Sequence, residues 1–247
     1  MSTFRYTRPD NFPPVVKNLI IINVLVWVAQ LVFHFNFQLT SKLALYPIDT
    51  ADFEPYQIFT HMFAHSAVER TVDGYQPVFF HIFFNMFALW MFGRMLENVW
   101  GAKRFLIFYL VCGIGAAAVH LLVQHLQYDP EMVRAFYMAE MSGNERLANE
   151  IFYKMDFVRP AVGASGAVMG VFVGAAMLFP NTQMMMLFIP FPIKLKWLVL
   201  VMVAFDLFGG FNPNSNSGIA HFAHLGGALT GFILIMIWNK TNRRSLY

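Results

Sequence analysis

Long runs of apolar residues, separated by short polar stretches, dominate the order of side chains along this 247-residue chain. A helix needs about 20 apolar residues to cross a hydrocarbon core of about 30 Å. Six runs meet or approach that length, and they predict transmembrane helices over residues 18–37, 77–96, 105–126, 164–179, 195–208 and 219–238. The predicted fold class is an all-α polytopic membrane protein with a bundle of six transmembrane helices.

The composition favours a membrane protein over a soluble domain. Hydrophobic residues make up 57% of the chain and charged residues 13%, with a mean hydropathy of +0.51. A soluble domain is about 45–50% apolar and about 25% charged. The net charge of +3 is too small to indicate a nucleic-acid partner. Because Cys112 is the single cysteine, a disulfide framework and a cysteine-based metal cluster are excluded, and we expect neither a metal nor a cofactor.

The basic residues predict an orientation, since cytoplasmic loops carry an excess of Lys and Arg. With both termini cytoplasmic, the inside holds 11 of the 17 basic residues: Arg5, Arg8, Lys17, Arg94, Lys103, Arg104, Lys194, Lys196, Lys240, Arg243 and Arg244. We therefore expect one membrane domain over residues 1–247 with both ends inside. The external segments 38–76 and 127–160 would lie outside, and apolar residues at helical spacing predict one or two amphipathic helices in the second.

Polar side chains at membrane depth are costly, so each one is a candidate for a functional role. In the predicted orientation the second, fourth and sixth spans run from outside to inside. His81 and Asn85 lie in the first turns of the second span, Ser165 begins the fourth, and His221 and His224 begin the sixth. At 1.5 Å per residue, all five lie within roughly 10 Å of the outer ends of their helices. Three helices thus offer hydroxyl, imidazole and amide groups at one depth.

This combination of groups is typical of nucleophilic catalysis. A serine hydroxyl is activated by a neighbouring base, usually histidine, and acyl transfer needs donors aimed at the developing oxyanion. The start of the fourth span offers unpaired backbone N–H groups and the positive end of a helix dipole. His81 and Asn85, four residues apart on one helix face, could add side-chain donors. Spacing alone does not decide whether His221 or His224 is the base.

Glycine stripes indicate how closely these helices could approach. Gly166, Gly170 and Gly174 recur at every fourth residue on the fourth span, and Gly227 and Gly231 do so on the sixth. Such stripes let membrane helices pack backbone to backbone, which would bring the serine and histidine spans together. Glycine stripes also occur where packing is their only role.

Each polar residue has a structural alternative when it is considered alone. Ser165 could cap a helix start, Asn85 could hold two helices together, and a buried histidine often makes only a polar contact. These alternatives do not explain the common depth of the five residues. The remaining histidines near predicted span ends receive no catalytic role: His61, His65, His120 and His125.

Four short motifs follow one another along the chain. They are His81-Ile-Phe-Phe-Asn85, Gly93-Arg94-Met-Leu-Glu97, Gly163-Ala-Ser165-Gly166, and Ala223-His224-Leu-Gly-Gly227 with Gly231. In this order they resemble the HxxxN, GRxxE, GxSG and AHxxGxxxG motifs of the rhomboid family of intramembrane serine proteases. The resemblance covers about residues 15–240.

The resemblance implies a Ser–His dyad without a third, acidic member, in which Ser165 is the nucleophile and His224 the general base. It implies that His81, Asn85 and the backbone N–H of Ser165 stabilise the oxyanion. It also implies that a short fourth helix places the serine below the membrane surface, in a cavity open to the outside. The glycines that would pack around this site are Gly163, Gly166, Gly170, Gly227 and Gly231.

The implied activity is hydrolysis of a peptide bond in a single-pass transmembrane protein, near the outer face of the lipid bilayer. The expected location is the inner membrane of a bacterium, and the oligomeric state is left open. One alternative is an inactive relative that binds or escorts membrane clients, although such relatives usually lose the serine or the histidine. Another is a haem-binding or ion-conducting bundle, which would leave Gly-Ala-Ser-Gly unexplained.

Some features depart from the family pattern, among them the length of the stretches 66–80 and 127–160, and the role of Asp206 is left open. Tyr56-Gln57 stands where the family often has Trp-Arg, which leaves open how the 38–76 segment is anchored. Met169 stands where some members have an aromatic residue one turn after the serine. Asp206, near the outer end of the fifth span, could orient a histidine or close a helix end, and the sequence favours the structural role.

Overall fold

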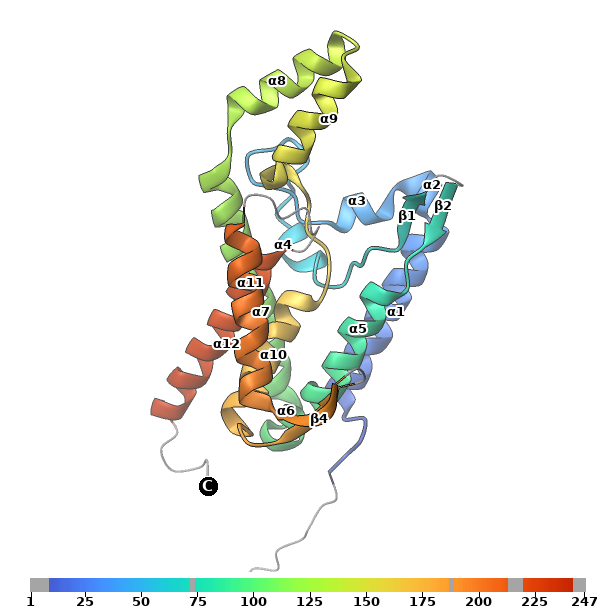
Figure 1. Ribbon diagram of the computed structural model, residues 1–247. Helices are drawn as coiled ribbons and strands as arrows, with labels where there is room; N and C mark the ends of the chain where they lie inside the picture. Colours follow the sequence, from blue (N-terminus) through green and yellow to red (C-terminus); the bar gives the residue numbers. More distant parts are fainter. Residues whose placement is uncertain (1–8, 72–73, 187–188, 213–219, 242–247) are drawn as a thin grey trace, which may run out of the picture.

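The computed structural model describes residues 9–71, 74–186, 189–212 and 220–241, and α-helices dominate it (Figure 1). The long helices are α1 (Pro14–Val32), α7 (Ala102–Gln127), α10 (Ser165–Leu178), α11 (Leu195–Phe211) and α12 (His221–Thr241). Another long helical run is divided into α5 (Phe80–Ala88), the π-helix η1 (Leu89–Gly93) and α6 (Arg94–Trp100).

Shorter elements connect these helices. They are α2 (His34–Phe37), α3 (Leu39–Leu43), α4 (Gln57–Thr60), α8 (Pro130–Met141), α9 (Glu145–Lys154) and the 3₁₀ helix η2 (Asp156–Val158). Two antiparallel hairpins pair β1 (Val68–Thr71) with β2 (Gly74–Pro77) and β3 (Gln183–Met186) with β4 (Ile189–Lys194). In the first hairpin Glu69 lies opposite Gln76, and in the second Gln183 lies opposite Lys194.

Helices occur in all six segments that the sequence predicts as spans, and the chain is a multi-pass membrane protein. Within the described residues, three helices are long and apolar enough to cross a membrane by themselves: Pro14–Val32, Ala102–Gln127 and His221–Lys240. α10 has only 14 residues, or about 21 Å at 1.5 Å per residue. Five predicted positions lie outside the described residues: Ile219 at the start of the last span, and the basic residues Arg5, Arg8, Arg243 and Arg244.

α10 is the central helix of the bundle. Its residues 166–176 are all buried, and it packs against both α7 and α12 (Figure 1). Its glycines and alanines let neighbouring helices approach it closely from several sides. By contrast, α1, α5 and α11 expose large apolar side chains such as Leu25, Phe84 and Phe208. An apolar outer surface of this kind suits contact with lipid.

The two ends of the bundle differ (Figure 1). α5, α10 and α12 begin towards the end that carries α8 and α9, whereas α6 and the β3–β4 hairpin lie at the opposite end. The start of α1 and the end of α12 also lie at that opposite end. An even number of crossings requires this placement, because each crossing reverses the direction of the chain.

The 127–160 segment forms two helices, which confirms the amphipathic helices expected there. The carboxylate of Asp129 accepts from the backbone N–H groups of Glu131 and Met132, which caps the start of α8. The side-chain oxygen of Asn144 accepts from the N–H of Leu147 and caps α9 in the same way. The two helices pack on each other beyond the end of the bundle (Figure 1).

Candidate active site

Ser165 is the first residue of α10, and the chain just before it is held by the 38–76 segment. Leu45 and Ala161 exchange two backbone hydrogen bonds of 2.9 Å, and the N–H of Gly163 donates to the carbonyl of His61 at 2.9 Å. These hydrogen bonds hold residues 161–163, which directly precede α10, in place. The position of the serine therefore depends on residues that lie far away in the sequence.

Gly163 has a backbone conformation and surroundings that only glycine tolerates. Its φ of +129° lies in the left-handed region. A Cβ atom at this position would lie 3.0 Å from His81 Nε2 and 3.6 Å from Ser165 Oγ. The imidazole of α5 and the hydroxyl of α10 thus border the same small space.

His81 and Asn85 lie one turn apart on α5. The N–H of Ser66 donates to His81 Nδ1 at 3.2 Å, so Nδ1 acts as the acceptor and the ring carries its hydrogen on Nε2. This Nε2–H is the nitrogen next to Gly163. The amide of Asn85 donates one hydrogen to the carbonyl of His81 at 2.8 Å and has a second hydrogen for another acceptor.

α12 approaches α10 through glycines. A Cβ at Gly227 would collide with the carbonyl oxygen of Gly166, and a Cβ at Gly231 would lie 2.9 Å from the backbone of Gly170. A Cβ at Gly166 would lie 3.3 Å from the carbonyl oxygen of Ala223, next to His224. The two helices therefore contact each other backbone to backbone at the level of Ser165.

His221 and His224 share one carboxylate. The Nδ1 atoms of His221 and His224 lie 2.8 Å and 3.0 Å from Oδ1 of Asp206 on α11. The sequence left the role of Asp206 open, although a carboxylate in an apolar helix at the depth of the other polar groups is itself a signal. Among the described hydrogen bonds, none joins Ser165 Oγ to His224. In ligand-free enzymes such bonds are often long before substrate binds.

His61 and His65 are buried beside this site, in the 38–76 segment. Burial lowers the pKa of His61 to about 4 and that of His65 to about 3, so both rings are neutral at pH 7. The His65 ring packs edge-on against the His81 ring with centroids 5.2 Å apart. The side chain of Gln30 holds the backbone of His65 by accepting from its N–H and donating to its carbonyl.

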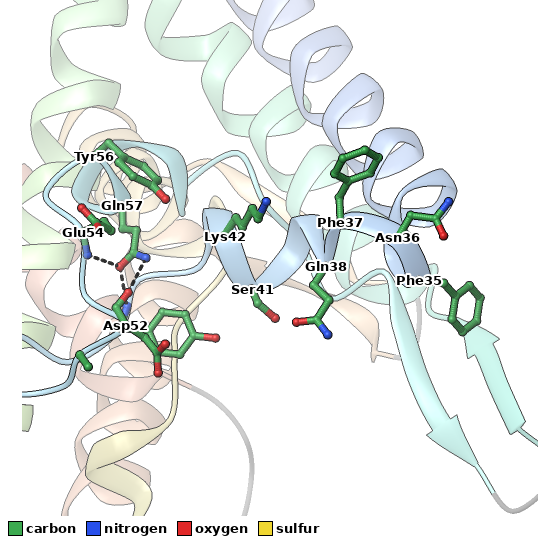
Figure 2. Close-up of a pocket in the computed structure, with 12 residues that line it drawn as sticks. Phe35, Asn36, Phe37, Gln38, Ser41, Lys42, Asp52, Glu54, Tyr56 and Gln57 are labelled. Carbon is green, nitrogen blue, oxygen red and sulfur yellow. Dashed lines mark hydrogen bonds between the residues drawn. The ribbon is translucent and has the colours of Figure 1, made fainter.

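Gln57, at the position of the departure from Trp-Arg, organises the same segment. Its side-chain oxygen accepts from the N–H groups of Tyr46 and Glu54, and its amide donates to the carbonyl of Asp52 at 2.9 Å. Figure 2 shows this cluster of bonds beside an open hollow of about 530 Å³, lined also by Lys42. The departure from Trp-Arg left open how the 38–76 segment is anchored. The buried side chain of Gln57 holds part of this segment together through these three hydrogen bonds.

No predicted site residue lines that hollow. Across the described parts of the chain, no group of three or more His, Cys, Asp or Glu side chains could hold a metal ion. The groups described near the start of α10 are a hydroxyl, imidazoles, an amide and a carboxylate.

Comparison with known proteins identifies the family. Residues 52–240 match the Rhomboid domain. Rhomboid protease AarA of Providencia stuartii is 28% identical over 160 residues, which are 62% of this chain and 49% of AarA. Rhomboid protein 1, mitochondrial, of Saccharomyces cerevisiae is 28% identical over 155 residues, 63% of this chain and 37% of that protein. Presenilin-associated rhomboid-like protein, mitochondrial, of Homo sapiens is 26% identical over 166 residues, 66% of this chain and 34% of that protein.

The matched regions span about half or less of the length of these relatives. The match to the family domain is broader, because it covers most of this chain and includes all four motifs. This chain belongs to the rhomboid family.

Proposed function

We propose that this protein is an intramembrane serine endopeptidase that cleaves transmembrane segments of other membrane proteins. The observation that carries the proposal is the space at Gly163, which His81 Nε2 and Ser165 Oγ both border. A nucleophile and a hydrogen-bond donor from separate helices face each other there, as acyl transfer requires. The similarity to Rhomboid protease AarA, a protein named as a protease, agrees with it.

In the proposed reaction, His224 Nε2 takes the proton of Ser165 Oγ while the oxygen attacks the scissile carbonyl. The backbone N–H of Ser165, the His81 Nε2–H and the Asn85 amide stabilise the resulting oxyanion. His224 then gives the proton to the leaving amine, and the C–N bond breaks to leave an ester on Ser165. Water, deprotonated by His224, hydrolyses that ester and restores the hydroxyl.

The proposed substrates are single-pass transmembrane proteins, cut near the outer face of the bilayer. We place six spans in the membrane, with both termini in the cytoplasm of a bacterium. The distribution of basic residues and the position of both bundle termini at one end support this arrangement. Because α10 is short and begins inside the bundle, the serine would be reached from water at the outer end.

The test is cleavage of a model transmembrane substrate by the full-length protein in proteoliposomes. Ser165→Ala and His224→Ala should each abolish cleavage, and the double variant should lose little more, because the members of a catalytic unit are not additive. A serine-directed fluorophosphonate should label the wild type but not Ser165→Ala. Ser142→Ala, a change at an exposed serine after α8, should cleave and label like the wild type.

The proposal fails if Ser165→Ala keeps more than a few per cent of the activity. A wild-type protein that binds the substrate but neither cleaves it nor reacts with the fluorophosphonate would identify the inactive relative instead.

A further inference from the structure

Asp206 is buried where its neighbours on α11 are not. Among residues 200–212, all of which the structure describes, Asp206 alone is buried, and 4% of its side chain is exposed. Phe205, Leu207 and Phe208 beside it are 58%, 45% and 74% exposed. A carboxylate at this depth of a membrane bundle is costly unless hydrogen bonds compensate for the lost water. Its position therefore depends on the partners that it finds.

Those partners are both histidines of the first turn of α12. Oδ1 of Asp206 lies 2.8 Å from Nδ1 of His221 and 3.0 Å from Nδ1 of His224. An ionised carboxylate only accepts hydrogen bonds, so each Nδ1 must donate. A neutral imidazole with its hydrogen on Nδ1 has its lone pair on Nε2. Asp206 thereby gives His224 the tautomer that a general base for Ser165 needs.

The two histidines differ in their surroundings. The His221 side chain is 5% exposed, its ring lies 5.7 Å from that of Phe205, and a Cβ on Gly209 would collide with it. His221 thus packs onto α11. The His224 side chain is 18% exposed and follows Ala223, whose carbonyl faces Gly166 of α10. The bond to His221 joins α11 to α12, whereas the bond to His224 reaches the proposed general base, which follows the residue that contacts Gly166.

We propose that Asp206 is a positioning residue for catalysis, which holds His224 in the Nδ1–H tautomer and stabilises the imidazolium formed when Ser165 loses its proton. This inference rests on the proposed function. It replaces the two-membered site that the family resemblance implies with a Ser–His–Asp arrangement, in which the carboxylate accepts a hydrogen bond but takes no proton. The proton moves from Ser165 to His224 and then to the leaving amine.

The decisive variant is Asp206→Asn in the full-length protein, assayed in proteoliposomes. Asparagine keeps the size of the side chain, but its amide can donate to His224 Nδ1 and so favours the wrong tautomer. In a soluble serine protease the corresponding change lowers kcat about 10⁴-fold. Here we expect kcat to fall at least about 100-fold, with KM within about threefold, because the carboxylate acts on the imidazolium of the transition state. Asp206→Glu, which keeps the negative charge, should have a kcat at least about tenfold higher than that of Asp206→Asn.

His221→Asn is the matched control, since it removes the other partner of the same oxygen. We expect it to keep at least about a fifth of the wild-type kcat, even where its thermal unfolding midpoint falls. The inference is overturned if Asp206→Asn folds and keeps more than about a third of the wild-type kcat. Equal losses of kcat in Asp206→Asn and His221→Asn, with the same fall in thermal unfolding midpoint, would also overturn it. Asp206 would then serve only to hold α11 and α12 together.

A measurement on the unaltered carboxylate covers the case in which Asp206→Asn does not fold. In protein with ¹⁵N-labelled histidine, the His224 signals are identified by their absence in His224→Gln. Their shifts should report the Nδ1–H tautomer at neutral pH, and the Nε2–H tautomer would overturn the inference. Failure of the proposed function is separate, because the wild type itself would then not cleave or Ser165→Ala would remain active.

Discussion

At the scale of single residues, the two histidines assigned to the site are held in opposite tautomers. The N–H of Ser66 donates to Nδ1 of His81, which leaves a hydrogen on Nε2, whereas Nδ1 of His224 donates to Asp206 and leaves a lone pair on Nε2. One ring therefore offers a donor, as an oxyanion requires. The other offers an acceptor, as the proton of a serine hydroxyl requires. One backbone amide and one carboxylate thus distinguish two identical side chains, as the roles proposed above require.

The donor role predicts the kinetics of His81→Ala and Asn85→Ala. Loss of one oxyanion donor costs about 10²–10³ in kcat in soluble serine proteases. Because several donors overlap here, we expect about 10² for each single variant and a much larger loss for the double variant, with KM barely changed. Initial rates over a range of substrate concentrations in proteoliposomes measure both constants. A raised KM with an intact kcat in Asn85→Ala would make Asn85 a substrate-binding or packing residue.

At the scale of elements, the close packing of α12 on α10 brings Ala223, the residue before His224, next to Gly166, the residue after Ser165. A Cβ at Gly227 would collide with the backbone of Gly166, which cannot move aside as a flexible side chain could. Gly174, one step further along the stripe on α10, faces Leu96 and Phe108 instead of α12. The contact between the two helices is thus concentrated near the proposed active site.

Gly227→Ala tests this contact. Overpacking a close interface costs about 1–3 kcal/mol, so we expect a lower thermal unfolding midpoint and a loss of cleavage activity. Leu229→Ala is the matched control on the same helix, because Leu229 is 53% exposed and its truncation should change neither quantity appreciably. Wild-type stability and activity in Gly227→Ala would contradict the packing described above.

The 38–76 segment is the second element that positions the site, and its buried histidines make it sensitive to acid. In the folded protein burial lowers the pKa of His61 to about 4 and that of His65 to about 3, against 6.5 for an unperturbed histidine. Below pH 6.5 the unfolded chain therefore binds protons that the folded chain does not. Stability is complete above that pH and falls as the pH is lowered towards the folded values.

We expect each of these two buried histidines to lower the free energy of unfolding at pH 5 by about 2 kcal/mol relative to pH 7.5. Thermal unfolding midpoints measured at both pH values in His61→Gln and His65→Gln should show a smaller drop than the wild type. His125→Gln is the control, because His125 is exposed and pairs with Asp49. Its unfolding midpoint should fall between the two pH values by as much as that of the wild type. An unchanged drop in both buried variants would exclude their burial as the cause.

At the scale of the whole molecule, the outer surface and the two ends decide how the protein lies in a membrane. Exposed apolar residues cover α1, α5 and α11, while the β3–β4 hairpin and the α8–α9 pair extend from opposite ends (Figure 1). The proposed orientation puts α8 and α9 outside and the loop before α7 in the cytoplasm. Cys112 is the single cysteine of the sequence, so its replacement gives a background free of native thiols.

Single cysteines in that background report the orientation. After expression in a bacterium, Glu145→Cys on α9 should react with a membrane-impermeant thiol reagent in intact spheroplasts, and Lys103→Cys should react only after permeabilisation. Both side chains are exposed, so accessibility depends on the side of the membrane alone. The reverse pattern would invert the topology, and reaction of both in intact spheroplasts would rule out the proposed spans.

Much of the architecture is determined locally by the sequence. In a membrane each backbone polar group must be satisfied within its own helix, so a run of apolar residues suffices to predict α7, α10 and α12 to within a few residues. The bounds of the first span, residues 18–37, were predicted less well, because α1 begins at Pro14 and ends at Val32 and the short α2 follows it up to the left-handed Gln38. The polar residues at one depth and the family motifs likewise made Ser165, His81 and His224 the predicted site residues without any knowledge of the fold.

The tertiary structure alone decided which partners these residues have. The shared carboxylate of Asp206 and the amide of Ser66 on His81 each join groups from different elements or loops. Nothing in the local sequence favours one of these pairs over another. These buried groups bind the partners that the packing of the chain brings within about 3 Å, since leaving a polar group unpaired in an apolar interior costs about 1–3 kcal/mol.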